Sequence, residues 1–133
     1  MDKLEYIPGD LVMVKKSALQ FAKDKIFKVI SSLSGGFLKV VMLNDSSTTY
    51  SISNNAIRPI PLTSEILEKN GWKENKGDYI NDSYHLHLCG KYDGYSVYKV
   101  VNDYNVVWLT GVRNVSDLQH LLFGLGINQE MEV

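Results

Sequence analysis

Short runs of β-branched and aromatic residues, separated by turn-forming residues, fill the first half of the chain. The runs at residues 11–15, 26–31, 37–43, 48–52 and 57–60 are each typical of a strand. Residues 53–56 indicate a single 3₁₀ turn before the last run. Five short strands bury little core as a flat sheet, whereas closing the sheet removes its exposed edges. We therefore predict a small five-stranded β-barrel over residues 1–61.

The second half begins with a helix whose ends are marked in the sequence. Thr63 is typical of an N-cap, and Glu65 lies in the first turn, where the helix dipole favours an anion. Asn70-Gly71 predicts the end of the helix, because glycine adopts the left-handed conformation without a steric penalty. Residues 73–78 are polar and indicate a loop. The pattern therefore predicts a helix over residues 64–70, with Trp72 as an anchor just beyond it.

A three-stranded antiparallel meander and a closing helix are predicted for the remainder. One strand runs from about residue 84 to 92, and Asp93-Gly94 is the strongest hairpin signal in the chain. This turn sets Cys89 opposite Tyr98, and a turn at residues 102–103 leads to a third strand over residues 104–110. A capping box with Ser116 as N-cap and Gln119 at N3 begins the closing helix, which ends at Gly126. The predicted fold class is α+β, with a barrel over 1–61 joined through a proline hinge to an α+β domain over 62–133.

Alternation sorts the predicted meander into two faces. The core face carries Tyr84, Leu86, Leu88, Val97, Val101, Val106 and Trp108. The second face carries His85, His87, Cys89, Tyr98, Val100, Val107 and Leu109. Because the second face is too apolar to be fully hydrated, we expect it to be covered by the barrel, by a partner or by a second copy of the chain.

Charge and cysteine content narrow the function only slightly. The formal net charge is −1, but residues 1–61 carry eight Lys or Arg against five Asp or Glu, whereas residues 62–133 carry six against ten. This asymmetry is a weak indication of an anionic partner for the first half. The single cysteine, Cys89, excludes an intramolecular disulfide and predicts a reducing compartment. With no signal-peptide pattern and no membrane-length apolar run, we expect a cytoplasmic protein.

Two resemblances accompany these patterns. Residues 7–61 resemble a small barrel of the Src-homology-3 type in strand order, without a diagnostic motif and without the aromatic groove that would imply binding of proline-rich peptides. Residues 61–72 (PLTSEILEKNGW) and 115–123 (VSDLQHLLF) resemble a group of small uncharacterised proteins of gut Bacteroidetes, their phages and their mobile elements. That second resemblance spans about residues 57–126 and departs from the group at Trp72, Ser116 and His120. It implies a phage or mobile-element context and names no catalytic residue.

His85-Leu86-His87-Leu88-Cys89 is the spacing most suggestive of chemistry. Alternate residues of a strand share a face, so two imidazoles and a thiol could converge on zinc, although no fourth ligand is evident. The favoured interpretation is a partly covered strand face without metal or cofactor. Cys89 as a nucleophile is disfavoured, because His87 lies about 7 Å away along the strand. Three loop aspartates, Asp78, Asp82 and Asp103, are better explained as turn formers than as ligands of a hard cation.

These patterns favour a non-catalytic binding or adaptor module that acts through protein contacts and self-association. The predicted contact residues are His85, His87, Tyr98 and Phe123. The alternative is a nucleic-acid-binding accessory protein that uses the basic barrel face, carried by Lys15, Lys16, Lys25, Lys28 and Lys39, with Phe21, Phe27 and Phe37 interleaved. An enzyme is not expected.

Overall fold

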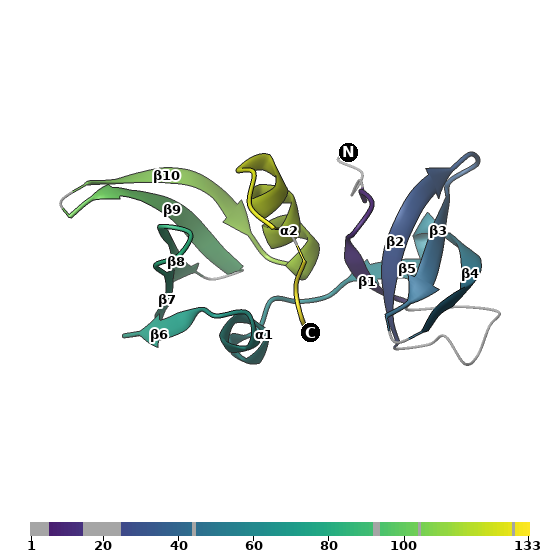
Figure 1. The fold of residues 1–133 in the computed structure, drawn as a ribbon, viewed down its shortest axis with the longest axis horizontal. Helices are drawn as coiled ribbons and strands as arrows, with labels where there is room; N and C mark the ends of the chain where they lie inside the picture. The colour runs from purple at the N-terminus through teal and green to yellow at the C-terminus, as the bar shows by residue number, and fades with distance from the viewer. Residues whose placement is uncertain (1–5, 15–24, 44, 92–93, 104, 129) are drawn as a thin grey trace. The chain divides into compact units, whose positions relative to one another are not determined.

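The computed structural model describes the chain except for residues 1–5, 15–24, 44, 92–93, 104 and 129. The chain consists of two compact units, Met1–Ile60 and Pro61–Val133 (Figure 1). The predicted lysines Lys15 and Lys16, together with Phe21, lie outside the described residues.

Unit 1 is an antiparallel sheet of five strands in the order β4-β3-β2-β1-β5. Its strands are β1 (Leu11–Val14), β2 (Ile26–Leu33), β3 (Phe37–Met42), β4 (Asp45–Ser53) and β5 (Ile57–Pro59). The predicted 3₁₀ turn is confirmed as η2 (Asn54–Ala56), with the Ser53 hydroxyl accepting a hydrogen bond from the Asn55 N–H. Alternate residues of the strands, including Val12, Val14, Phe27, Val29, Leu38, Val40, Ile52 and Ile57, form a buried core with Tyr6.

The predicted closed barrel is wrong. Within the described residues β5 pairs with β1 and no pairing joins β5 to β4, so the sheet remains open. The physical reason lies in β5, which is only three residues long and ends in Pro59, a residue with no N–H to donate to a further ladder. A strand this short can pair with β1, but it is too short to pair with β4 as well and so close the sheet.

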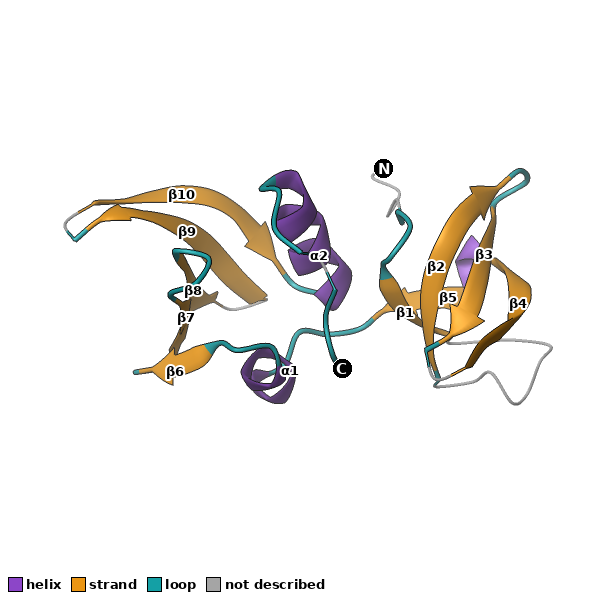
Figure 2. Cartoon of the chain, viewed as in Figure 1, coloured by secondary structure: helices purple, strands orange, loops and turns teal. Residues whose placement is uncertain are grey.

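Unit 2 holds a second antiparallel sheet of five strands, in the order β10-β9-β8-β7-β6. Its strands are β6 (Lys73–Asn75), β7 (Asp78–Asn81), β8 (Leu86–Lys91), β9 (Gly94–Asn102) and β10 (Asn105–Val112). The unit also contains α1 (Ser64–Lys69) and α2 (Val115–Gly124). Figure 2 shows how far strands outweigh helices in the chain. The predicted α+β class is therefore wrong: the protein is mostly β, with two open antiparallel sheets.

Two strands of unit 2, β6 and β7, occupy the region predicted as a polar loop and the residues just beyond it. Asn75 pairs with Asp78 across a two-residue turn in which Lys76 and Gly77 both have positive φ, 55° and 88°. This is the conformation of a type I′ hairpin turn, which usually carries Asn or Asp at its first position. Here the first turn position is a lysine, and the three residues of β6 are polar and exposed. The hairpin therefore shows neither the usual turn residue nor an alternation of apolar and polar residues, which is why a loop was predicted.

The first helix begins as predicted and ends at Lys69, one residue before the predicted end, whereas the second begins earlier than predicted. Thr63 caps α1 by accepting a hydrogen bond from the Ile66 N–H, and Gly71 follows the helix with φ 87°. The predicted capping box at Ser116 is wrong, because Asn114 is the N-cap of α2 and the Asp117 carboxylate accepts from the backbone N–H of Arg113 (2.9 Å) and of Asn114 (3.2 Å). Ser116 is buried instead, on the core side of the helix.

The register of β8, β9 and β10 differs from the prediction. Cys89 lies opposite Ser96 rather than Tyr98, and His87 lies opposite Tyr98. The reason is Gly94, which belongs to β9 and not to the turn: a Cβ there would overlap the carbonyl oxygen of Val112. Only glycine therefore permits this approach of two backbone segments.

Two β-bulges break the predicted alternation: one in β9 at Val101, between the Asn105–Asn102 and Val106–Val100 pairs, and one in β10 at Leu109, between the Trp108–Tyr98 and Thr110–Val97 pairs. Trp108 lies opposite Tyr98, and therefore on the face of His87 rather than on the predicted core face. Leu86, Leu88 and Val97 are buried as predicted. The core of unit 2 further includes Leu62, Leu67, Trp72, Tyr79, Val112, Val115, Leu118 and Leu122.

Candidate functional site

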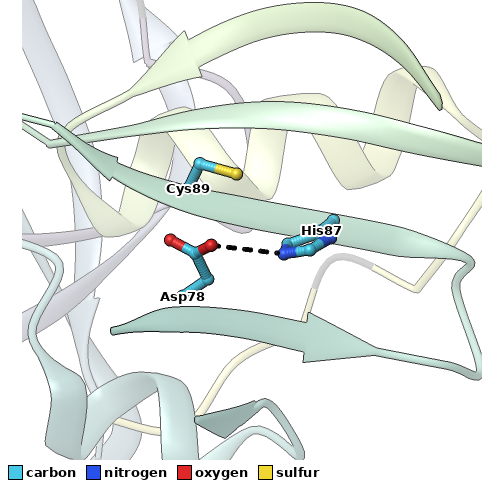
Figure 3. Close-up of side chains that lie close together, drawn as sticks. All are labelled: Asp78, His87 and Cys89. Atoms are coloured by element: carbon cyan, nitrogen blue, oxygen red, sulfur yellow. Dashed lines mark ion pairs between the residues drawn. The ribbon is translucent and has the colours of Figure 1, made fainter. Parts of the chain in front are cut away.

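Three side chains that can bind a metal ion converge on one face of the second sheet. Asp78 from β7 lies beside His87 and Cys89 from β8 (Figure 3). One ligand atom of each, a carboxylate oxygen, an imidazole nitrogen and the thiol sulfur, lies within 4.8 Å of the other two. All three side chains are partly buried.

The strand register explains this convergence. Tyr79 pairs with Leu88 and Ile80 with His87, so extending the ladder by one residue sets Asp78 opposite Cys89. His87 and Cys89 are alternate residues of β8 and share a face, while Leu86 and Leu88 between them enter the core. Burial of the two leucines thus fixes which way the histidine and the cysteine point.

Backbone contacts orient the carboxylate toward the imidazole. Oδ1 of Asp78 accepts a hydrogen bond from the Gly90 N–H at 3.3 Å, and Oδ2 lies 3.6 Å from Nε2 of His87. That separation exceeds the usual hydrogen-bond range. Nε2 of His87 is buried and has no hydrogen-bond partner among the described residues, although the side chain as a whole is 29% exposed.

His85 does not join this cluster, contrary to the predicted His-x-His-x-Cys strand face. It lies in the turn before β8, exposed and with φ 55°, and its carbonyl accepts a hydrogen bond from the Val100 N–H at 2.8 Å. Asp78, which the sequence favoured as a turn former over a cation ligand, is the third member of the cluster. Recognising it required the β7–β8 pairing, which the apolar pattern of residues 73–81 does not reveal.

The cluster is better suited to holding a metal ion than to nucleophilic catalysis. Carboxylate, imidazole and thiolate are all common zinc ligands. A nucleophilic triad instead needs hydrogen-bond contact between the acid and the base, and the Asp78–His87 separation of 3.6 Å is too long for that.

A second feature is the exposed apolar surface of the β9–β10 hairpin. We call Val101, Val106, Val107 and Trp108 the hairpin patch; these side chains are 60%, 54%, 50% and 58% exposed. Figure 1 shows this end of the hairpin extending beyond β8, β7 and β6. All four were predicted to be on the core or covered faces of a meander, but the hairpin is longer than the strands that support it.

The other predicted contact residues are dispersed. Tyr98 is partly buried in β9, between His87 and Trp108 in the cross-strand row. Phe123 is 62% exposed, on α2. The structure thus brings His87 and Tyr98 together but leaves His85 and Phe123 outside this row.

A groove of about 910 Å³ lies between α2 and the adjoining ends of β9 and β10. Tyr95, Thr110, Asp117, His120 and Leu121 are among its lining residues. The Asp117 carboxylate is already engaged in capping α2. Burial, and secondarily the neighbouring Tyr79 phenol, raises the pKa of Tyr95 above its usual value, so Tyr95 stays neutral near pH 7.

Two of the predicted basic residues share the outer face of the first sheet. Lys28 alternates with the buried Phe27 and Val29, and Lys39 alternates with the buried Leu38 and Val40. Phe37, 43% exposed, is two residues from Lys39 on the same strand face. Phe27 belongs to the core and cannot contact a ligand on this face, contrary to the predicted interleaving.

The chain matches no protein-family model, and no curated protein or solved structure shows significant similarity to it. The resemblance to the Bacteroidetes group therefore stays a prediction. Among the helices of the described residues, none is long and apolar enough to cross a membrane.

Proposed function

We propose that the chain is a non-catalytic protein-binding module that acts through the edge strand β10, with a second copy of the chain as its simplest partner. The observation that carries this proposal is the hairpin patch, in which Val106, Val107 and Trp108 are exposed on the edge strand β10 and Val101 is exposed on the neighbouring strand β9. We also infer a cytoplasmic location from the single cysteine.

The four sheet edges of the described chain differ in how well they resist pairing with another strand. β5 and β6 are three residues long, one with arginine and proline and the other with lysine and glutamate. β4 is longer, but its sequence DSSTTYSIS is mainly polar. Short length, charge and proline are the usual protections of an edge strand. These three edges therefore carry some or all of those protections.

β10 lacks these protections. Its eight residues, NVVWLTGV, include no charge and no proline. Because the two copies of an antiparallel β10 pair would be related by twofold symmetry, each contact would occur twice, and no like charges would face one another. The bulge at Leu109, after Trp108, limits the regular ladder along β10 to a few residues, so side-chain contacts of Trp108 must contribute much of the binding.

The two tryptophans allow a direct test, because Trp72 is 2% exposed and Trp108 is 58% exposed. In a Trp72→Phe variant, Trp108 is the only tryptophan emitter. We expect its emission to resemble that of a hydrated indole at high dilution and to shift to shorter wavelength as protein concentration rises. The matched variant Trp108→Phe retains only the buried Trp72 and should show no such dependence. Emission of Trp108 that is independent of concentration would contradict self-association through β10.

A second candidate function is binding of single-stranded nucleic acid by the outer face of unit 1. It is favoured by the placement of Lys28 and Lys39 on one face with the exposed ring of Phe37, because single strands combine phosphate contacts with stacking on aromatic rings. Lys25 lies exposed just before β2 and adds a third positive charge.

If these three lysines each neutralise one phosphate, affinity for a labelled single-stranded oligonucleotide should fall roughly 20-fold between 50 and 200 mM salt. Replacing Lys25, Lys28 and Lys39 with glutamine should remove most of that binding in a fluorescence anisotropy titration. A charge-matched control replaces Lys69, Lys73 and Lys76, three exposed lysines of unit 2. Equal losses in both triple variants would show that only net charge matters and would contradict this candidate.

A further inference from the structure

We propose that Asp78, His87 and Cys89 bind one divalent metal ion of the zinc type. This site is independent of the proposed protein contact, since it uses β7 and β8 rather than β10. Its starting point is the convergence of three different ligand types within 4.8 Å on one sheet face (Figure 3).

The distances suit a small ion. Zinc lies about 2.0–2.3 Å from nitrogen, oxygen and sulfur ligands, which places neighbouring ligand atoms of a tetrahedral site roughly 3.3–3.7 Å apart. Oδ2 of Asp78 and Nε2 of His87 are already 3.6 Å apart. The remaining separations, at most 4.8 Å, close by about 1 Å through side-chain rotation, without any movement of the strands.

The hydrogen bonding around the cluster also fits a metal site. Nε2 of His87 is buried without a hydrogen-bond partner in the described structure, which is costly for a polar nitrogen and is relieved when the nitrogen binds a cation. Oδ1 of Asp78 is held by the Gly90 N–H, leaving Oδ2 directed at the histidine. Such an outer contact is how proteins orient a metal-binding carboxylate.

The ligand set selects the class of ion. Binding requires that Cys89 lose its thiol proton to solvent, so one thiolate and one carboxylate would balance the charge of a divalent cation. Calcium and magnesium prefer all-oxygen sites, whereas zinc accepts sulfur, nitrogen and oxygen together. Because the Asp78 and His87 side chains are 38% and 29% exposed, a water molecule can complete a tetrahedral site with three protein ligands.

The test uses the full, untagged chain with a non-chelating reductant. Calorimetric titration with Zn²⁺ should give one ion per chain, and titration with Co²⁺ should give a thiolate-to-cobalt charge-transfer band in the near ultraviolet. We expect Cys89→Ser to abolish that band and His87→Ala to weaken Zn²⁺ binding at least 10-fold. Asp78→Asn should weaken it in the same direction while preserving the volume of the side chain.

His85→Ala and His120→Ala are the matched controls, because both histidines belong to unit 2 and lie outside the cluster. They should change the affinity less than twofold. Emission of the buried Trp72 checks that each variant is folded. Absence of stoichiometric Zn²⁺ binding, or binding that survives His87→Ala and Cys89→Ser in folded protein, would overturn the proposal.

Discussion

Replacing Gly94 with alanine is expected to destabilise unit 2 by roughly 3 kcal/mol. Gly94 has φ 147°, a conformation that L-residues rarely adopt. An added Cβ would also overlap the Val112 carbonyl oxygen and lie 3.1 Å from the Cα of Arg113, so backbone would have to move. Both tryptophans of the chain, Trp72 and Trp108, belong to unit 2, and urea unfolding followed by tryptophan emission therefore reports on this unit.

Gly77→Ala is the matched control for that prediction. Gly77 also has a positive φ, 88°, but a Cβ there meets no atom within 4 Å. Its substitution should cost only about 1 kcal/mol, from backbone strain alone. Equal costs at the two glycines would show that the close approach of Gly94 to Val112 does not constrain the fold.

Replacing Val106 with lysine is expected to weaken self-association on the order of 100-fold, or about 3 kcal/mol. Val106 is 54% exposed on the uncharged edge strand β10 and lies opposite Val100, so a lysine there is well hydrated in the single chain. In a pair of β10 strands, twofold symmetry would bring two lysines into the interface and bury charge without a partner.

Phe123→Lys is the control for the position of the contact. Phe123 is an equally exposed apolar residue, at 62%, but it lies on α2 rather than on β10. We expect association to persist in this variant when sedimentation velocity profiles are compared at equal concentration. If Phe123→Lys dissociates the protein and Val106→Lys does not, the contact lies on the helix and the assignment to β10 is wrong.

Local signals in the sequence predicted local structure well. The N-cap at Thr63, the positive φ at Gly71 and the 3₁₀ turn at residues 54–56 follow from residue chemistry over a few positions. The burial of Leu86, Leu88 and Val97 follows from simple alternation in β8 and β9. Such features depend on residues that are neighbours in sequence, so a single amino-acid sequence is enough to predict them.

Features that depend on partners distant in sequence were missed. The predicted barrel failed because strand order alone does not say whether β5 meets β4, and Pro59 and a length of three residues decide that it does not. The faces of β10 were wrongly assigned because a bulge in β9 at Val101 and a bulge in β10 at Leu109 each shift the alternation by one residue, and no glycine marks either position.

The candidate metal site also combines a local feature, which the sequence predicts, with a feature that depends on strand pairing, which it does not. His87 and Cys89 are two residues apart in one strand, so the sequence alone places them on one face. Asp78 joins them only through pairing of β7 with β8, and His85 leaves them because its positive φ places it in the turn. Sequence spacing therefore placed His87 beside Cys89, but it wrongly added His85 to the cluster and did not reveal that Asp78 belongs there.

Sedimentation velocity of the unmodified chain over a dilution series tests most directly whether β10 is a contact edge. We expect a sedimentation coefficient that rises with concentration from that of a 15.0 kDa single chain toward that of a dimer. We also expect Val106→Lys to remain at the single-chain value throughout the series. A wild-type chain that stays a single species of 15.0 kDa at every concentration would contradict self-association through this edge.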